Sequence, residues 1–159
     1  MLKGMDGKVA IVTGAGQGLG RAEALELARQ GVKVVVNDFS PGGSENPAEK
    51  VAAEIREAGG DAVVHSGDVA DWNSAQALVR QAIDTYGSLD ILVNNAGVLR
   101  DRMIFNMSEE EWDLVIRVHL KGHFCTLRHA SEYWRNKSKE TSAPVNARVI
   151  NTSSEAGLL

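Results

Sequence analysis

The stretch "TGAGQGLG", residues 13–20, constrains the fold of this chain more than any other part of it. It follows the β-branched run "KVAIVT", residues 8–13, and opens into an amphipathic segment, residues 19–30, that ends before Gly31. A buried strand, a glycine-rich turn and a helix together bring free N–H groups and the positive end of the helix dipole to one point. Because glycines let the backbone approach a pyrophosphate closely, this pattern predicts an anion site at the helix N-terminus.

The glycine spacing departs from the strict dinucleotide fingerprint G-x-G-x-x-G, because the sixth position counted from Gly14 is Leu19. It matches T-G-x-x-x-G-x-G instead. The alternative is a turn that only connects a strand to a helix, and the strand before it and the helix after it argue against that alternative. The residues expected to contact a nucleotide in this loop are Gly14, Gln17, Gly18, Leu19 and Gly20.

Strands and helices alternate along the rest of the chain. Further strands are expected at residues 32–38, 62–65, 89–93 and 148–152, and helices at 48–58, 73–86 and within 108–135. The polar stretch 136–146 is expected to be either a surface excursion or mobile. Helices of about ten to fifteen residues between strands indicate βαβ units. The sequence therefore predicts an α/β fold, a Rossmann-like doubly wound parallel sheet with helices on both faces.

The composition argues against nucleic acid and membranes as binding partners. Lys and Arg number 17 against 21 Asp and Glu, and this net charge of −4 argues against nucleic acid. No apolar run reaches the length of a membrane span, and the first residues lack the features of a signal peptide, so no membrane partner is expected. The single cysteine, Cys125, is expected to be a buried thiol in a reducing compartment. These features predict a single-domain cytoplasmic protein without a metal site.

Asp38 ends the second expected strand, where the adenosine ribose of a dinucleotide would lie. A carboxylate there accepts hydrogen bonds from the ribose hydroxyls and repels a 2′-phosphate, so it favours NAD over NADP as the cofactor. Apart from Lys33, no Arg or Lys occurs between Arg29 and Lys50 to offset that repulsion. The alternative is a solvated aspartate in a turn.

Asp68 follows the third expected strand in "SGDVAD". At the carboxyl end of a strand it faces the ligand crevice and can accept a hydrogen bond from the adenine amino group, while Val69 offers a neighbouring backbone N–H. Asp71 competes as the N-cap of the helix expected from Asn73. We therefore assign ligand contact to Asp68 and capping to Asp71.

The fourth strand runs into "NNAG", residues 94–97. Together with "TGAGQGLG", "GDV" and "INTSS", this motif resembles the short-chain dehydrogenase/reductase family along essentially the whole chain. The strings "VVVND" and "VHLKGHF" are most similar to the dehydrogenase domain of the peroxisomal multifunctional enzymes and their bacterial relatives. The resemblance implies NAD(P)-dependent hydride transfer between a small-molecule alcohol and a ketone. It also implies that Asn95, Ala96 and Gly97 lie close to the cofactor, whereas Asn94 is structural.

The family uses Ser, Tyr and Lys for catalysis, commonly with an Asn in the long helix. The resemblance implies that the hydroxyl of Ser154, the second serine of "TSS", bonds the reacting oxygen, with Ser153 as the neighbouring alternative. Where the family has Asn in V-N-x-x-G, this chain has His119, as the multifunctional-enzyme-like members do. His119 is therefore either a packed, hydrogen-bonded residue or a member of the proton path.

The family's acid/base tyrosine and its lysine, in the motif Y-x-x-x-K, are expected shortly after Leu159, as are two further strands and a substrate-binding loop. Neither Tyr86 nor Tyr133 is expected to replace that tyrosine. We therefore expect residues 1–159 to be the N-terminal part of a longer single-domain dehydrogenase, inactive alone and without its C-terminal strands. The alternative is a non-catalytic NAD-binding or regulatory module.

Family members usually pair through the long helix after the fourth strand. Around Trp112, Phe124 and Trp134 the chain has apolar residues on more than one side, as a helix buried against both its own core and a partner would. A homotetramer or a homodimer is expected. The loop at residues 98–105 is expected to line one wall of the substrate pocket.

Overall fold

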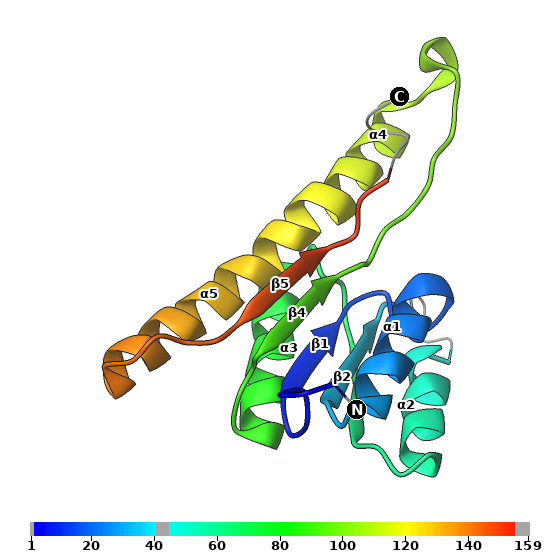
Figure 1. Ribbon diagram of the computed structural model, residues 1–159. Helices are drawn as coiled ribbons and strands as arrows, with labels where there is room; N and C mark the ends of the chain where they lie inside the picture. Colours follow the sequence, from blue (N-terminus) through cyan, green and yellow to red (C-terminus); the bar gives the residue numbers. More distant parts are fainter. Residues whose placement is uncertain (1, 41–44, 155–159) are drawn as a thin grey trace.

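The computed structural model describes residues 2–40 and 45–154 of the chain. In this part of the chain, five parallel strands form one sheet in the order β3-β2-β1-β4-β5 (Figure 1). The strands are β1 (Val9–Val12), β2 (Lys33–Asp38), β3 (Ala62–Ser66), β4 (Ile91–Asn94) and β5 (Arg148–Asn151). From β1 the chain adds β2 and then β3 on one side of the sheet. It then crosses back to add β4 on the other side of β1, so the strand order reverses at β1. The predicted doubly wound α/β fold is confirmed.

Helices cover both faces of the sheet (Figure 1). They are α1 (Gly18–Arg29), α2 (Ala48–Glu57), α3 (Trp72–Tyr86), α4 (Glu109–Ile116) and α5 (Gly122–Thr141), with a short 3₁₀ turn η2 (Ile104–Asn106) and a π-helical turn η3 (Arg117–Lys121). Helices α1 and α2 lie on one face, and α3 and α5 lie on the other. Within the described residues, none of these helices has the length and apolar character needed to cross a bilayer.

The central strand shows why the fold has two apolar cores. Ala10 and Val12 belong to the core on the α1 and α2 face, whereas Val9 and Ile11 belong to the core on the α3 and α5 face. Successive side chains of a strand point to opposite faces, so a strand buried on both faces is a continuous apolar run. Cys125 of α5 is buried, as the sequence predicted.

The cap of α3 confirms one prediction made from the sequence. Asp71 precedes this helix, and its Oδ1 accepts a hydrogen bond of 2.7 Å from the Ser74 backbone N–H. Such a bond satisfies one of the free N–H groups at the helix N-terminus. Asp71 is therefore the capping residue of the "SGDVAD" segment, which leaves the Asp68 side chain available for other contacts.

The end of the long helical region differs from the prediction. Helix α5 continues to Thr141, so residues 136–141 are helical and only the remainder of the stretch 136–146 is a loop. The polar residues in this stretch include good helix formers such as Lys and Glu, and their lack of an apolar face does not prevent an exposed helix. Figure 1 shows that α4, η3 and α5 form one rod that extends past the sheet at both ends.

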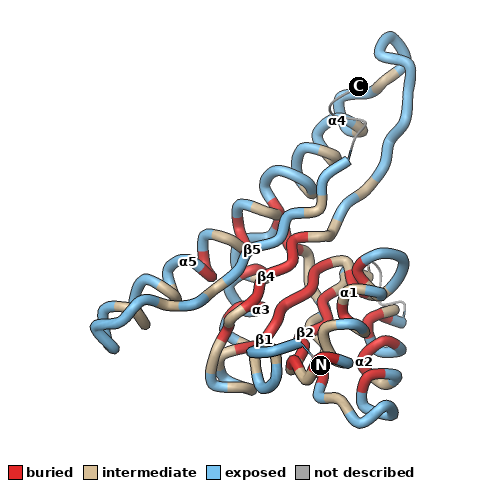
Figure 2. The backbone as a smooth tube through the Cα atoms, viewed as in Figure 1, coloured by how far each residue is buried: buried red, intermediate tan, exposed pale blue. Residues whose placement is uncertain are grey.

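Strand β5 is the exposed edge of the described sheet. All four of its residues are exposed, among them Val149 and Ile150, whereas β1 and β4 are buried (Figure 2). Its only partner strand in the described sheet is β4, with Arg148 opposite Ile91. An apolar strand at the edge of a sheet is the kind of surface that further structure normally covers.

Candidate functional site

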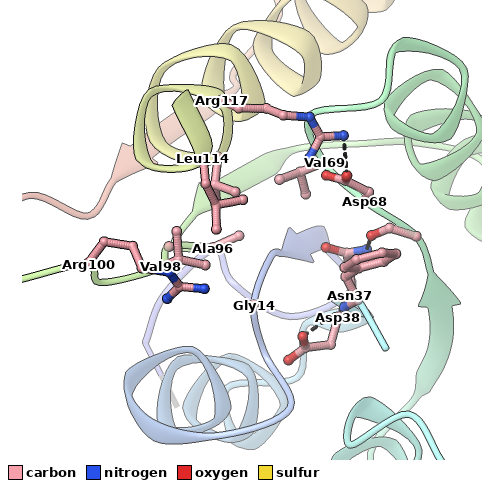
Figure 3. A pocket seen from close by; sticks show the side chains of 14 residues that line it. Gly14, Asn37, Asp38, Asp68, Val69, Ala96, Val98, Arg100, Leu114 and Arg117 are labelled. Atoms are coloured by element: carbon pink, nitrogen blue, oxygen red, sulfur yellow. Dashed lines mark hydrogen bonds and ion pairs between the residues drawn. The ribbon is translucent and has the colours of Figure 1, made fainter. Parts of the chain in front are cut away.

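A cavity of about 360 Å³ opens at the carboxyl edge of the sheet (Figure 3). Its walls come from the segments that end or follow β1, β2, β3 and β4, together with residues of α4 and η3. Ligands of open α/β sheets bind at this edge, where the strand order reverses. The lining residues are Gly14, Asn37, Asp38, Phe39, Gly67, Asp68, Val69, Ala96, Gly97, Val98, Arg100, Leu114, Arg117 and Val118.

The cavity brings together many of the predicted nucleotide contacts. Those that line it are Gly14, Asp38, Asp68, Val69, Ala96 and Gly97. The others lie beside it: Gln17, Gly18 and Leu19 are exposed where α1 begins, Gly20 is buried in the first turn of α1, and Asn95 belongs to the turn after β4. Within the described residues, no group of three or more His, Cys, Asp or Glu side chains is arranged to bind a metal ion.

Gly14 is the point where the turn after β1 touches the turn after β4. Its φ is +61°, and a Cβ atom placed on it would lie 2.7 Å from the Cα of Ala96. Such a distance is far inside van der Waals contact, and the left-handed conformation favours glycine. The backbone geometry at this position therefore requires glycine.

Thr13 and Asn95 join the same two turns by hydrogen bonds. The buried Thr13 Oγ1 donates to Val93 O at 3.3 Å and accepts from the backbone N–H groups of Asn95 and Ala96, both at 3.0 Å. The Asn95 side-chain Nδ2 donates back to Thr13 O at 3.1 Å. Asn95 was predicted to contact the cofactor, and the structure shows that its side chain holds the floor of the site together. Thr13 is the first residue of the T-G-x-x-x-G-x-G pattern, but it was not among the predicted site residues.

Asp38 occupies the position predicted for a ribose-binding carboxylate. Its Oδ2 accepts from the Gly16 N–H and its Oδ1 accepts from the Phe39 N–H, both at 2.7 Å. A carboxylate has about four acceptor positions, so these two bonds orient the group and leave capacity for ribose hydroxyls. The first bond also ties the end of β2 to the glycine-rich loop.

Asp68 has a partner that the sequence did not reveal. Its Oδ1 accepts from the Ala70 N–H at 2.8 Å, and its Oδ2 forms an ion pair with Arg117 Nη2 of η3 (Figure 3). Arg100, from the segment after β4, is a second unpredicted cation in the cavity lining. Both arginines are far from Asp38 and Asp68 in the sequence, so only the folded arrangement places them there.

Asn37 and His65 support the rim of the cavity. The buried Asn37 Nδ2 donates to His65 Nδ1 and to Gly67 O, both at 3.0 Å. Because an amide nitrogen only donates, His65 Nδ1 must be the unprotonated acceptor in this contact. Burial lowers the pKa of His65 below its ordinary value of 6.5, which favours the same neutral form.

Acidification is therefore expected to weaken this part of the fold. His65 takes up a proton more readily in the unfolded chain than in the folded one, so its contribution is complete above pH 6.5 and is lost as the pH falls below that value. We expect the free energy of unfolding, measured with urea, to decline between about pH 7.5 and about pH 5. His65→Gln should show a shallower decline than the wild type. Parallel curves for the two proteins would contradict this role of His65.

The comparison with known proteins decides the family. Residues 8–159 match the family described as short chain dehydrogenase. The chain belongs to this family. The resemblance stated from the sequence motifs is therefore confirmed, and members of the family are oxidoreductases that bind NAD or NADP.

This chain is shorter than three similar proteins. Hydroxyacyl-CoA dehydrogenase ChsB1 of Mycobacterium tuberculosis is 52% identical over 98% of this chain, which covers 49% of that protein. Peroxisomal multifunctional enzyme type 2 of Mus musculus is 44% identical over 96% of this chain, which covers 20% of that protein. A crystal structure of a short chain dehydrogenase from Mycobacterium avium is 53% identical, with a TM-score of 0.90 over 96% of this chain and 56% of that one. The chain thus spans about half the length of the first relative.

The two residues predicted to be catalytic lie outside the cavity lining. The ring of His119, on η3, lies against Gly97 and Val98, and its Nε2 is 3.0 Å from Val98 N and 2.8 Å from Val98 O. The hydrogen-bonded part of one alternative is therefore present, but His119 is exposed rather than buried. Ser154 is exposed in the segment that follows β5. Catalytic roles for Ser154 and His119 stay predictions.

A Y-x-x-x-K spacing does occur within this chain, at Tyr133 and Lys137. Lys137 Nζ donates to Tyr133 Oη at 3.1 Å. This pair lies on α5, where Tyr133 packs against the core on the α3 face, and neither residue lines the cavity. The spacing is that of neighbours on one helix turn, so it carries no acid/base role at the site.

Proposed function

We propose that this protein is the N-terminal part of an NAD-dependent dehydrogenase that interconverts a secondary alcohol and a ketone by hydride transfer. The cavity at the carboxyl edge of the sheet carries the proposal, because it gathers Gly14, Asp38 and Asp68 from three separate strand ends. A dinucleotide has three features to be held there. The pyrophosphate fits the N-terminus of α1, the ribose fits Asp38, and the adenine fits Asp68 and Val69.

The preference for NAD rests on Asp38. Its carboxylate is held by two backbone N–H groups beside the glycine-rich loop, where a 2′-phosphate would meet a negative charge. Of the two cations in the cavity lining, Arg117 is paired with Asp68 and Arg100 comes from the segment after β4, beside Val98 (Figure 3). Among the described residues, Arg100 donates to Leu99 O and neither arginine forms an ion pair with Asp38.

A hydroxyacyl thioester is the substrate class we propose. Two of the similar proteins bear names that fit it: the hydroxyacyl-CoA dehydrogenase described above, and a 3-oxoacyl-[acyl-carrier-protein] reductase of Staphylococcus aureus that is 40% identical over 94% of this chain. The loop 98–105 is rich in exposed apolar side chains, namely Leu99, Met103, Ile104 and Phe105. These side chains suit contact with an acyl chain.

The catalytic groups are proposed from the family pattern. The Ser154 hydroxyl would bond the reacting oxygen, and His119 would contribute to the proton path from η3. The acid/base tyrosine and its lysine would follow Leu159, so residues 1–159 alone would bind the cofactor without turnover. The cytoplasm is the compartment we propose, although several relatives are named as peroxisomal.

We also propose that the protein forms a homo-oligomer, a dimer or a tetramer, through the α4–η3–α5 rod. Four large apolar side chains, Trp112, Ile116, Leu120 and Phe124, recur at helical spacing along this rod and are exposed. An exposed apolar row of this length is typical of an association surface. Light scattering tests the proposal, and a monodisperse monomer would contradict it.

The activity is tested with the full-length protein, a hydroxyacyl-CoA substrate and NAD, by following the absorbance of NADH. We expect turnover with NAD, and we expect Ser154→Ala to lower kcat about a hundredfold, because the hydroxyl stabilises the reacting oxygen. Ser153→Ala is the matched control and should retain most of the activity. NAD binding without turnover by the full-length protein would favour the non-catalytic NAD-binding module instead.

A further inference from the structure

Arg117 lines the cavity but was not among the site residues predicted from the sequence. Its guanidinium extends from η3 to Asp68 at the end of β3, and Nη2 lies 2.5 Å from Asp68 Oδ2 (Figure 3). The Asp68 side chain is only 16% exposed, whereas that of Arg117 is 43% exposed. A carboxylate that is mostly removed from water is costly without a partner, and the partly exposed guanidinium of Arg117 supplies one.

The two contacts of Asp68 fix the orientation of its carboxylate. Oδ1 accepts from the Ala70 N–H at 2.8 Å, and Oδ2 accepts from Arg117. A carboxylate has about four acceptor positions, so about two of those on Asp68 remain free after these bonds. Because Asp68 lines the cavity, a ligand can use them. The group is therefore a fixed hydrogen-bond acceptor on the cavity wall.

The backbone that carries Arg117 is also well defined. Turn η3 continues α4 into α5 without a break, and in the same turn His119 Nε2 lies 3.0 Å from Val98 N. The π-helical turn places both side chains toward the carboxyl edge of the sheet, one at the end of β3 and one beyond the end of β4. Such turns inside α-helices are frequent at functional sites.

We propose that Arg117 is a positioning residue that makes Asp68 selective for the amino group of adenine. The inference rests on the proposed function, because it concerns the adenine end of the same dinucleotide site. Adenine presents an amino donor where hypoxanthine presents a carbonyl acceptor, and a carboxylate accepts from the first and repels the second. With Arg117 in place, Asp68 holds the orientation needed for this discrimination. Without Arg117, only the Ala70 N–H still orients the carboxylate, and Oδ2 can rotate toward water.

The test compares NAD with nicotinamide hypoxanthine dinucleotide, in which a carbonyl replaces the 6-amino group of adenine and N1 carries a hydrogen. Calorimetric titration of the wild type should give a preference for NAD of about tenfold or more, as expected for one hydrogen bond to a charged group. Arg117→Gln should reduce the preference to about threefold or less. Arg29→Gln is the matched control, because Arg29 forms an exposed ion pair with Glu26 on α1 and lies outside the cavity. Its preference should equal that of the wild type.

Each other outcome has a defined meaning. An unchanged preference in Arg117→Gln, or an equal loss of affinity for both dinucleotides, overturns the role of Arg117 and leaves the proposed function intact. Failure of the wild type to bind either dinucleotide overturns both proposals. A double-mutant cycle with Asp68→Asn adds a second check, because the two substitutions must be non-additive in their effect on the preference. Additive effects on the preference overturn the proposal. If circular dichroism shows that Arg117→Gln is unfolded, the same measurements are made with Arg117→Lys.

Discussion

Asp38→Asn is expected to change the ratio of affinities for NAD and NADP by about a hundredfold in favour of NADP. The substitution keeps the size of the side chain and an oxygen that accepts from a backbone N–H, as Asp38 does from Gly16 and Phe39. It removes the negative charge that repels a 2′-phosphate and weakens the bonds to the ribose hydroxyls. The measurement is calorimetric titration of both proteins with both dinucleotides.

Asp84→Asn provides the control for this prediction. Asp84 is an exposed residue of α3 and lies outside the cavity lining, so the same loss of one charge there should leave the ratio unchanged. If Asp38→Asn and Asp84→Asn gave equal ratios, Asp38 would not be the residue that distinguishes the two cofactors.

Gly14→Val is expected to abolish measurable dinucleotide binding and to lower the free energy of unfolding by about 2 to 4 kcal/mol. The added Cβ would overlap the Ala96 backbone, because the two would lie 2.7 Å apart, and valine is strained at a φ of +61°. The turns after β1 and β4 would have to separate, which would displace the floor of the cavity. Urea denaturation and titration with NAD measure the two effects.

Gly59→Val separates backbone strain from damage to the site. Gly59 has a φ of +84°, but no atom lies within 4 Å of the position that a Cβ would take. Its substitution should cost stability through strain alone, about 1 to 3 kcal/mol, and leave NAD affinity unchanged. Near-normal NAD binding by Gly14→Val would show that the glycine-rich turn does not form the nucleotide site.

The sheet and the glycine-rich turn were predictable because they depend on local patterns. The run 8–13 is apolar and β-branched, and the glycines that follow open directly into α1, so strand, turn and helix were all visible in the sequence. Asp38 and Asp68 were also predictable, because Asp38 ends β2, Asp68 comes two residues after β3, and the carboxyl ends of parallel strands meet at one edge. The structure places both in one cavity.

Other features depend on contacts between distant segments, and the sequence pattern does not encode them. Arg117 meets Asp68 only because the α4–η3–α5 rod crosses the carboxyl edge of the sheet. Asn95 bonds the Thr13 backbone only because β1 and β4 are neighbours. Residues 136–141 look like a loop because they lack an apolar face, although polar helix formers extend α5 through them.

A crystal structure of the protein with NAD bound tests the central claim most directly. The account predicts the pyrophosphate at the N-terminus of α1, the adenosine ribose hydroxyls within hydrogen-bond distance of Asp38, and the adenine amino group on Asp68 beside Arg117. An NAD molecule bound elsewhere on the protein, or in this cavity with its ribose away from Asp38, would contradict the account.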